Sequence, residues 1–316
     1  MKTSNNMLFL VFIVIFVGLY QNLQACLNEH RALLNGGITI SDGDFDIPRA
    51  KYNLKDKTEL NEHILLLEEL YGKSKSLMDY SDLGVLLVYD GQYERAKAIF
   101  QEIEKKLPNR YQTATNLGTV YELLGKNDSA YYWIKKGIKL NPHSHEGSEW
   151  IHLKILEAKI KAKGDEKYLW STNILGINFG DGKTPEYKSN MPLDTLAKHI
   201  YIQLNERMTF LKPKDPTVAQ LLFDLGNAYA ITHDVKMGLK VLLMAQGYGY
   251  QSDVLTERIS YFKRLQAKVD KGSHSDTDTK SDKITLHSNA NTFFIVVGGL
   301  LSIMIVIFTF WKLKKK

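Results

Sequence analysis

Residues 83–108 read LGVLLVYDGQYERAKAIFQEIEKKLP, and residues 117–142 read LGTVYELLGKNDSAYYWIKKGIKLNP. The two stretches match at an offset of 34 residues, at Leu83, Gly84, Gly91, Ala96 and Pro108 and again at Leu117, Gly118, Gly125, Ala130 and Pro142. A period of this length is typical of a helix–turn–helix unit that cannot bury its apolar face alone and must stack on neighbours. The pattern favours a binding scaffold over an enzyme with a deep pocket.

Each copy predicts two helices joined by a tight turn, with small residues where the helices meet. We expect Gly84 to lie against Ala96, and Gly118 against Ala130, so that the two helices of each hairpin approach closely. Gly91, and Gly125 in the second copy, are expected to adopt the backbone conformation that the turn between the two helices requires. The proline that closes each copy cannot continue a helix and predicts the end of the second helix.

These features resemble the tetratricopeptide-repeat (TPR) family in the Leu-Gly before the turn, the Ala after it and the Pro at the end. The resemblance is strongest over residues 77–142, and Asp215-Pro216 opens a degenerate third copy as a helix cap followed by a proline. That copy continues through Leu225, Gly226, Tyr229, Gly238, Leu242 and Ala245. The resemblance implies an all-α fold, a right-handed α-solenoid of helical hairpins.

The rest of the exported body divides by composition and periodicity. We expect an irregular N-terminal cap at 26–55, TPR-like helical repeats at 56–164, an irregular insertion at 165–192, helices with the degenerate repeat at 193–269 and a flexible polar linker at 270–291. Within these ranges, Ser144 to Lys163 predicts one long helix, Leu193 to Leu211 another, and Leu255 to Val269 a closing helix.

Two apolar segments at the ends predict export and anchoring. Residues 1–25 have the build of a signal peptide, and the uncharged residues 292–311 are long enough for a transmembrane helix. The lysines of residues 312–316 place the C-terminus in the cytoplasm. We therefore expect a single-pass protein of a bacterial cytoplasmic (inner) membrane with a periplasmic repeat domain, and an uncleaved leader would give the same topology.

The only cysteine, Cys26, follows the predicted cleavage point after Ala25. Leu23 to Cys26 resembles a bacterial lipobox, which makes Cys26 a candidate for lipidation, although Gln24 is bulkier than that motif usually carries. Simple cleavage is the alternative.

Most of the net positive charge of the chain lies at its two ends. The formal net charge is +6, from 41 basic and 35 acidic residues. Lys2 and the four tail lysines account for five of these charges, which leaves the body from Cys26 to Asn291 near +1. A nucleic-acid partner is not expected, because such a partner needs basic charge clustered on a folded face.

Catalytic and metal motifs are weak. Residues 180–184 (GDGKT) lack the earlier glycine of a phosphate loop, and Asp42, Asp44 and Asp46 lack the glycine and glutamate of a calcium loop. His145, Glu149 and His152 are the best metal candidates, since one helix would place them on one face at i, i+4 and i+7. We expect neither a cofactor nor an enzymatic activity.

The family resemblance implies that the first helix of each hairpin lines a groove for a protein or peptide partner. Carried onto this chain, the groove consists of Ser81, Val85, Tyr89, Gln112, Thr115, Thr119, Glu122, Glu149 and Asn227. The subfamily that binds a C-terminal carboxylate uses Lys and Asn at such sites, whereas this chain has Ser, Val and Thr. A membrane-anchored scaffold for protein–protein interaction in the cell envelope is thus our main hypothesis.

An alternative hypothesis is a metal-dependent hydrolase or an envelope sensor that uses the insertion at 165–191. His145, Glu149 and His152 would then form its site.

Overall fold

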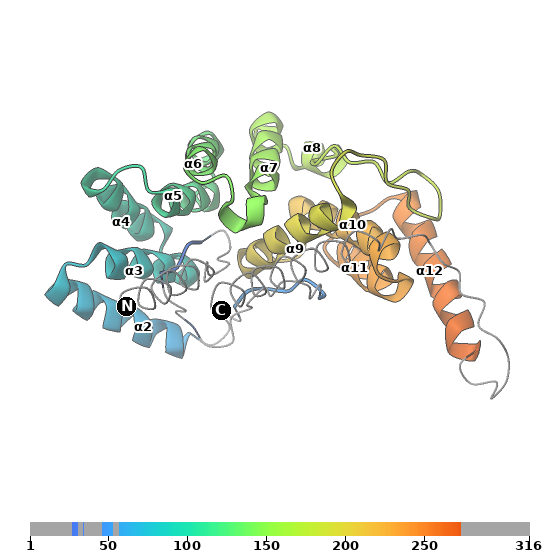
Figure 1. Cartoon of the computed structure of the whole chain (residues 1–316), viewed down its shortest axis with the longest axis horizontal. Helices are drawn as coiled ribbons and strands as arrows, with labels where there is room; N and C mark the ends of the chain where they lie inside the picture. The colour runs from blue at the N-terminus through green and yellow to red at the C-terminus, as the bar shows by residue number, and fades with distance from the viewer. Residues whose placement is uncertain (1–26, 31–33, 35–45, 53–56, 273–316) are drawn as a thin grey trace, which may run out of the picture. The chain divides into compact units, whose positions relative to one another are not determined.

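The computed structural model describes residues 27–30, 34, 46–52 and 57–272, and this part of the chain is helical, with no strand (Figure 1). The expected all-α class is confirmed for these residues. The elements are α2 (Thr58–Ser74), α3 (Leu77–Asp90), α4 (Tyr93–Lys106), α5 (Tyr111–Leu123), α6 (Asn127–Leu140), the 3-10 helix η1 (Ser144–Gly147), α7 (Glu149–Ala162), α8 (Glu166–Ser171), α9 (Leu193–Phe210), α10 (Pro216–Thr232), α11 (Val235–Gly247) and α12 (Asp253–Gly272).

Neighbouring helices pack in pairs, as a helical repeat requires. Helices α3 and α4 form the first hairpin, α5 and α6 the second, and α10 and α11 the third (Figure 1). Helices α2, α3, α4 and α5 share one apolar core, and α7, α9, α10 and α11 share another. The degenerate third copy predicted from the sequence therefore forms a hairpin like the other two.

A glycine in the first helix of each hairpin accepts a bulky side chain 16 residues later. A Cβ atom at Gly84 would lie 2.8 Å from the Phe100 ring, and one at Gly118 would lie 2.4 Å from Ile134 Cδ1. In the third hairpin, a Cβ atom at Gly226 would lie 2.7 Å from Leu242. The expected close approach of the two helices at Gly84 and Gly118 is confirmed, and these larger side chains provide the nearest atoms.

Helix ends follow the signals in the sequence. Gly91 and Gly125 have φ angles of +87° and +72°, a left-handed conformation that glycine adopts without a steric penalty. Asp215 caps α10 by accepting hydrogen bonds from the Thr217 and Val218 amides, with Pro216 in the first turn. The helices α4 and α6 end just before Pro108 and Pro142, as expected.

The predicted single helix from Ser144 to Lys163 is wrong. His145 and Glu146 have φ angles of +50° and +54°, which no α-helix accommodates, so η1 forms a separate turn and α7 begins at Glu149.

The insertion contains the short helix α8 and is otherwise irregular from residue 172 to residue 192. Arg258 of α12, which is fully buried, donates hydrogen bonds to the carbonyl oxygens of Phe179, Gly180 and Gly182 and so fixes this loop.

The chain divides into two compact units, Met1–Lys268 and Val269–Lys316, and the description that follows concerns the first. None of the helices in the described ranges is long and apolar enough to span a membrane. The predicted signal peptide, Cys26, the transmembrane segment 292–311 and the basic tail lie outside the described residues. Helix α12 continues to Gly272, into the range predicted as a linker, and residues 273–291 of that range lie outside the described residues.

Candidate functional site

The chain's own residues Leu27–His30, which we call the N-segment, lie against the first helices of the first two hairpins. The side chain of Asn116 in α5 forms hydrogen bonds with both the main-chain amide and the main-chain carbonyl of Asn28. The Asn28 amide donates to Asn116 Oδ1 at 2.7 Å, and Asn116 Nδ2 donates to the Asn28 carbonyl oxygen at 3.3 Å. A single carboxamide therefore satisfies both main-chain groups of one residue.

The hydrogen bonds continue on both sides of this residue. Asn28 Nδ2 donates to Thr115 Oγ1 at 2.6 Å, and the His30 amide donates to Asp82 Oδ1 of α3 at 2.7 Å. Leu27 is fully buried within the apolar core of the first hairpins. We call the surface that these contacts define on α3 and α5 the docking face.

The Glu29 carboxylate is the charged anchor of the N-segment. It accepts hydrogen bonds from Tyr89 of α3 at 2.8 Å, from Tyr52 at 3.0 Å and from Lys51 at 3.1 Å. Burial, and then the nearby carboxylates Glu29 and Glu206, raise the pKa of Tyr89 well above its usual value. The phenol therefore keeps its proton and serves as a donor.

Residues 46–52 form a second covering segment, which runs beside α9 (Figure 1). The Lys51 amide donates to the Asn205 carbonyl oxygen at 3.1 Å and to Thr209 Oγ1 at 2.9 Å, and the Arg49 amide donates to Asn205 Oδ1 at 2.9 Å. These contacts explain why polar residues of α9 are buried alongside its apolar ones.

The insertion covers the equivalent face of the third hairpin. Gln220 of α10 donates to the Leu169 carbonyl oxygen at 2.7 Å and accepts from the Ile174 amide at 3.1 Å. Its position in the repeat corresponds to that of Gln112, counted from the glycines Gly226 and Gly118. Side-chain amides thus hold main chain of other segments on α10 as well as on α5, here the end of α8 and the irregular residue Ile174.

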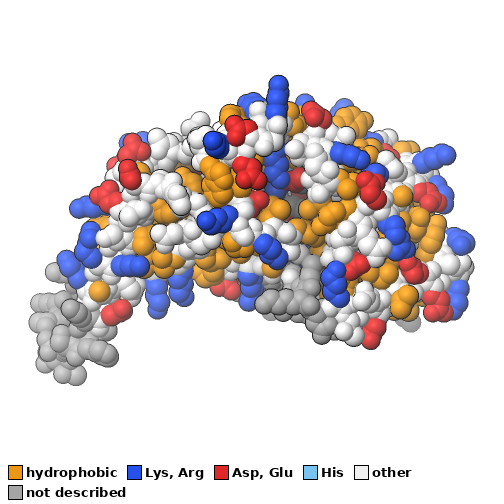
Figure 2. All heavy atoms as spheres, turned by 180° about the vertical axis from the view of Figure 1, so that it is seen from behind, with side chains coloured by type: hydrophobic (Ala, Val, Ile, Leu, Met, Phe, Trp, Pro, Cys, Tyr) orange, Lys and Arg blue, Asp and Glu red, His pale blue; other side chains and the backbone are white. Residues whose placement is uncertain are grey.

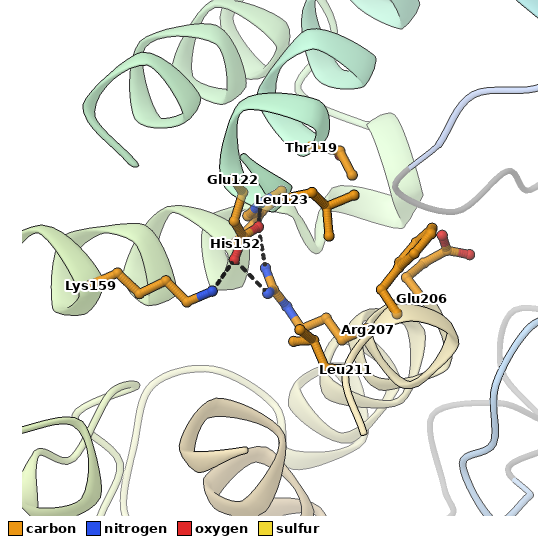
Figure 3. A pocket seen from close by; sticks show the side chains of 9 residues that line it. Thr119, Glu122, Leu123, His152, Lys159, Glu206, Arg207 and Leu211 are labelled. Carbon is orange, nitrogen blue, oxygen red and sulfur yellow. Dashed lines mark hydrogen bonds and ion pairs between the residues drawn. The ribbon is translucent and has the colours of Figure 1, made fainter. Parts of the chain in front are cut away.

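An ionic cluster joins α5, α7 and α9 next to the docking face. Lys159 and Arg207 converge on the Glu122 carboxylate, at 2.7 and 2.9 Å, and His152 Nε2 lies 2.6 Å from it (Figure 3). Burial alone would raise the pKa of Glu122, but Arg207, Lys159 and His152 outweigh burial and hold it well below its usual value. Glu122 is therefore a fixed anion that ties three helices together.

A cavity of about 140 Å³ adjoins this cluster and is lined by Glu122, Phe210 and seven neighbours. One of these neighbours, Glu206, is 2% exposed, and the Leu27 main-chain amide of the N-segment faces its carboxylate. The nearest cation is the Lys51 ammonium, at 3.8 Å. Burial raises the pKa of Glu206, and Lys51 only partly opposes this effect.

The metal candidates do not form a metal site. Within the described ranges, no three His, Cys, Asp or Glu side chains are arranged to hold a metal ion. His145 lies in η1, outside α7, so the expected single helix face for His145, Glu149 and His152 is wrong. Glu149 instead pairs with His145 and lies 3.4 Å from His152 Nδ1.

Most of the predicted groove residues are buried under the chain's own segments. Tyr89 and Thr115 contact the N-segment, Glu122 and Glu149 belong to the ionic cluster, and Asn227 accepts a hydrogen bond from Arg258 at 2.8 Å. Ser81, Val85 and Thr119 are buried on the same helices, and Gln112 is half-buried.

Sequence reasoning missed Asp82, Asn116 and Glu29. The first two directly precede the Leu-Gly pair at the same position of each copy, and this repeated polar residue was the signal that could have revealed them.

Figure 2 shows the described residues from behind the view of Figure 1, with basic and acidic side chains interspersed with hydrophobic ones. This is the pattern of solvated helix surfaces rather than of a single-sign binding patch.

Comparison with known proteins adds no assignment, since no protein-family model and no curated protein matches this chain. The function has to be argued from the docking face itself.

Proposed function

We propose that this protein is a membrane-anchored, TPR-like scaffold that binds an extended segment of a partner protein on its docking face. The repeats would form a right-handed solenoid, held in the periplasm of a bacterium by the C-terminal segment 292–311. The partner would contact the first helices of the hairpins.

One observation carries the proposal. Asp82 and Asn116 occupy equivalent positions, 34 residues apart, in two successive hairpins. Asp82 accepts from the His30 amide and Asn116 from the Asn28 amide, so the repeat presents one main-chain acceptor for every second residue of the bound segment. Alternate residues of an extended chain point their amides the same way, which suits a ligand bound along the row of hairpins.

The burial of these polar side chains supports the same conclusion. A buried hydroxyl, amide or carboxylate destabilises a fold unless a hydrogen-bond partner compensates for its lost hydration. Hairpins that had only to pack on each other would place apolar residues at Asp82, Thr115 and Asn116. The hydrogen bonds of Asp82 and Asn116 to main-chain groups of the N-segment support a face that holds peptide main chain.

A photo-crosslinking amino acid at Gln112 tests this proposal in living cells. Gln112 is half-buried and lies one helical turn before Thr115 and Asn116, on the same side of α5. We expect a covalent adduct with a discrete envelope protein that disappears in the Asn116→Ala variant.

The matched control places the crosslinker at Tyr132 of α6, which is 60% exposed. Absence of an adduct at Gln112, or an adduct that survives Asn116→Ala, would contradict the proposal, as would the same adduct at Tyr132.

A further inference from the structure

We propose that the N-segment is a built-in competitor for the docking face, and that the partner's segment carries the same chemistry. That segment would have an aliphatic residue, then a residue held by its main chain and a side-chain amide, then an acidic residue. This inference rests on the proposed function and specifies both its ligand class and its regulation.

The ligand class follows from the three subsites that the N-segment fills. Leu27 has a fully buried aliphatic side chain. Asn28 is held through its main chain by Asn116 and through its side-chain amide by Thr115. The Glu29 carboxylate meets the Tyr89 hydroxyl of α3. The three positions therefore select an aliphatic group, an amide and an acid.

The fit of the N-segment is imperfect, which favours exchange. Its Glu29 brings a second carboxylate towards Glu206, and both carboxylates lie near the single ammonium of Lys51, at 3.1 and 3.8 Å. Burial and then Glu29 raise the pKa of Glu206, and the Leu27 main-chain amide of the same N-segment opposes this effect. Departure of the N-segment would remove the like charge of Glu29 from Glu206 together with the Leu27 amide, so the repulsion in the docked state is only partly offset.

Exchange is also consistent with how the contacts are made. The hydrogen bonds from Asp82, Thr115 and Asn116 reach only main-chain groups and one side-chain amide of the N-segment. A segment from another protein offers the same main-chain groups. The N-segment has the advantage of being tethered, so a partner must exceed its high local concentration.

The experiment titrates a fluorescent peptide of sequence LNEHR, identical to residues 27–31, onto the full-length chain in detergent micelles. In the Leu27→Asp variant, a carboxylate would enter a fully buried apolar position and weaken docking of the chain's own segment. We expect this variant to bind the peptide at least about tenfold more tightly than the wild type.

Two further measurements define specificity. The peptide LNQHR, which lacks the acid, should bind the Leu27→Asp chain several-fold more weakly, and adding Asn116→Ala should abolish binding. The control variant Leu65→Asp, at a position that is 65% exposed, should bind LNEHR as the wild type does.

A milder variant keeps the proposal falsifiable if Leu27→Asp fails to fold. Asn28→Ala removes only the side-chain hydrogen bond to Thr115 and should tighten peptide binding about threefold. Unchanged peptide affinity in Asn28→Ala and in folded Leu27→Asp would refute the proposal that the N-segment competes for the docking face, even if the Gln112 crosslink appears in cells. Tighter peptide binding by these variants without any cellular crosslink would instead support competition by the N-segment and contradict the proposed binding of a partner protein.

Discussion

The glycine in the first helix of the second hairpin should be essential to packing, and Gly118→Ala tests this directly. The added Cβ atom would lie 2.4 Å from Ile134 Cδ1 and 3.2 Å from the Ile134 main-chain nitrogen, so either the Ile134 side chain must move or α5 and α6 must separate. Overpacking of this kind costs about 1–3 kcal/mol, and the higher helix propensity of alanine offsets about 1 kcal/mol. We expect a net loss of about 0–2 kcal/mol in the free energy of unfolding.

Gly72→Ala is the matched control, because no atom lies within 4 Å of a Cβ atom at that position of α2. It should raise stability by about 0.5–1 kcal/mol through helix propensity alone. Urea unfolding followed by circular dichroism measures both variants, and Ile134→Ala should reduce the cost of Gly118→Ala in a double-mutant cycle. If Gly118→Ala were as stable as Gly72→Ala, the close approach of the two helices would be refuted.

Three other predictions concern buried charges. Glu122→Gln should destabilise the chain by about 3–5 kcal/mol, because Lys159 and Arg207 would lose their counter-charge, and an unchanged urea midpoint would count against this role. Burial raises the pKa of Asp224 to about 8 from its usual 3.8, so the folded state holds the proton longer than the unfolded state. Thermal melts of the wild type should thus show stability falling by about 1.4 kcal/mol per pH unit as pH rises through that range and levelling off above it, while Asp224→Asn removes this dependence. Arg258→Met should free the insertion, seen as faster proteolysis of residues 172–192 with intact hairpins, and equal cleavage rates would show that other contacts hold the loop.

The hairpins could be predicted from the sequence because their signals are local. Gly91, Pro108 and Asp215 each act on the helix end beside them, and an apolar repeat of three and four residues marks a buried helix face. The third hairpin was predicted through the same pattern, although Gly238 replaces the alanine of the first two copies. The structure gives the reason, since a Cβ atom at Gly238 would lie 2.8 Å from the Gly226 carbonyl oxygen.

The occupant of the docking face could not be predicted in this way. Asn28 and Asn116 are 88 residues apart, and no periodicity links them. The break at η1 was missed because His145 and Glu146 adopt left-handed angles that residues of their type adopt only when tertiary contacts compensate for the strain. The ionic cluster around Glu122 could not be predicted either, because it joins helices that are far apart in the sequence.

The 34-residue repeat explains the helical hairpins. The buried polar residues within the repeat explain which irregular segments of the chain bind on those hairpins. Asn116 in the second hairpin and Gln220 in the third are both carboxamides, yet one holds the N-segment and the other holds the insertion. Main-chain recognition is indifferent to sequence, so each hairpin can hold a different irregular segment without losing the hydrogen bonds that its buried amide needs. Selectivity must then come from the few side-chain contacts, chiefly that of Tyr89 with a carboxylate, and a ligand without an acid at that position should leave the N-segment in place.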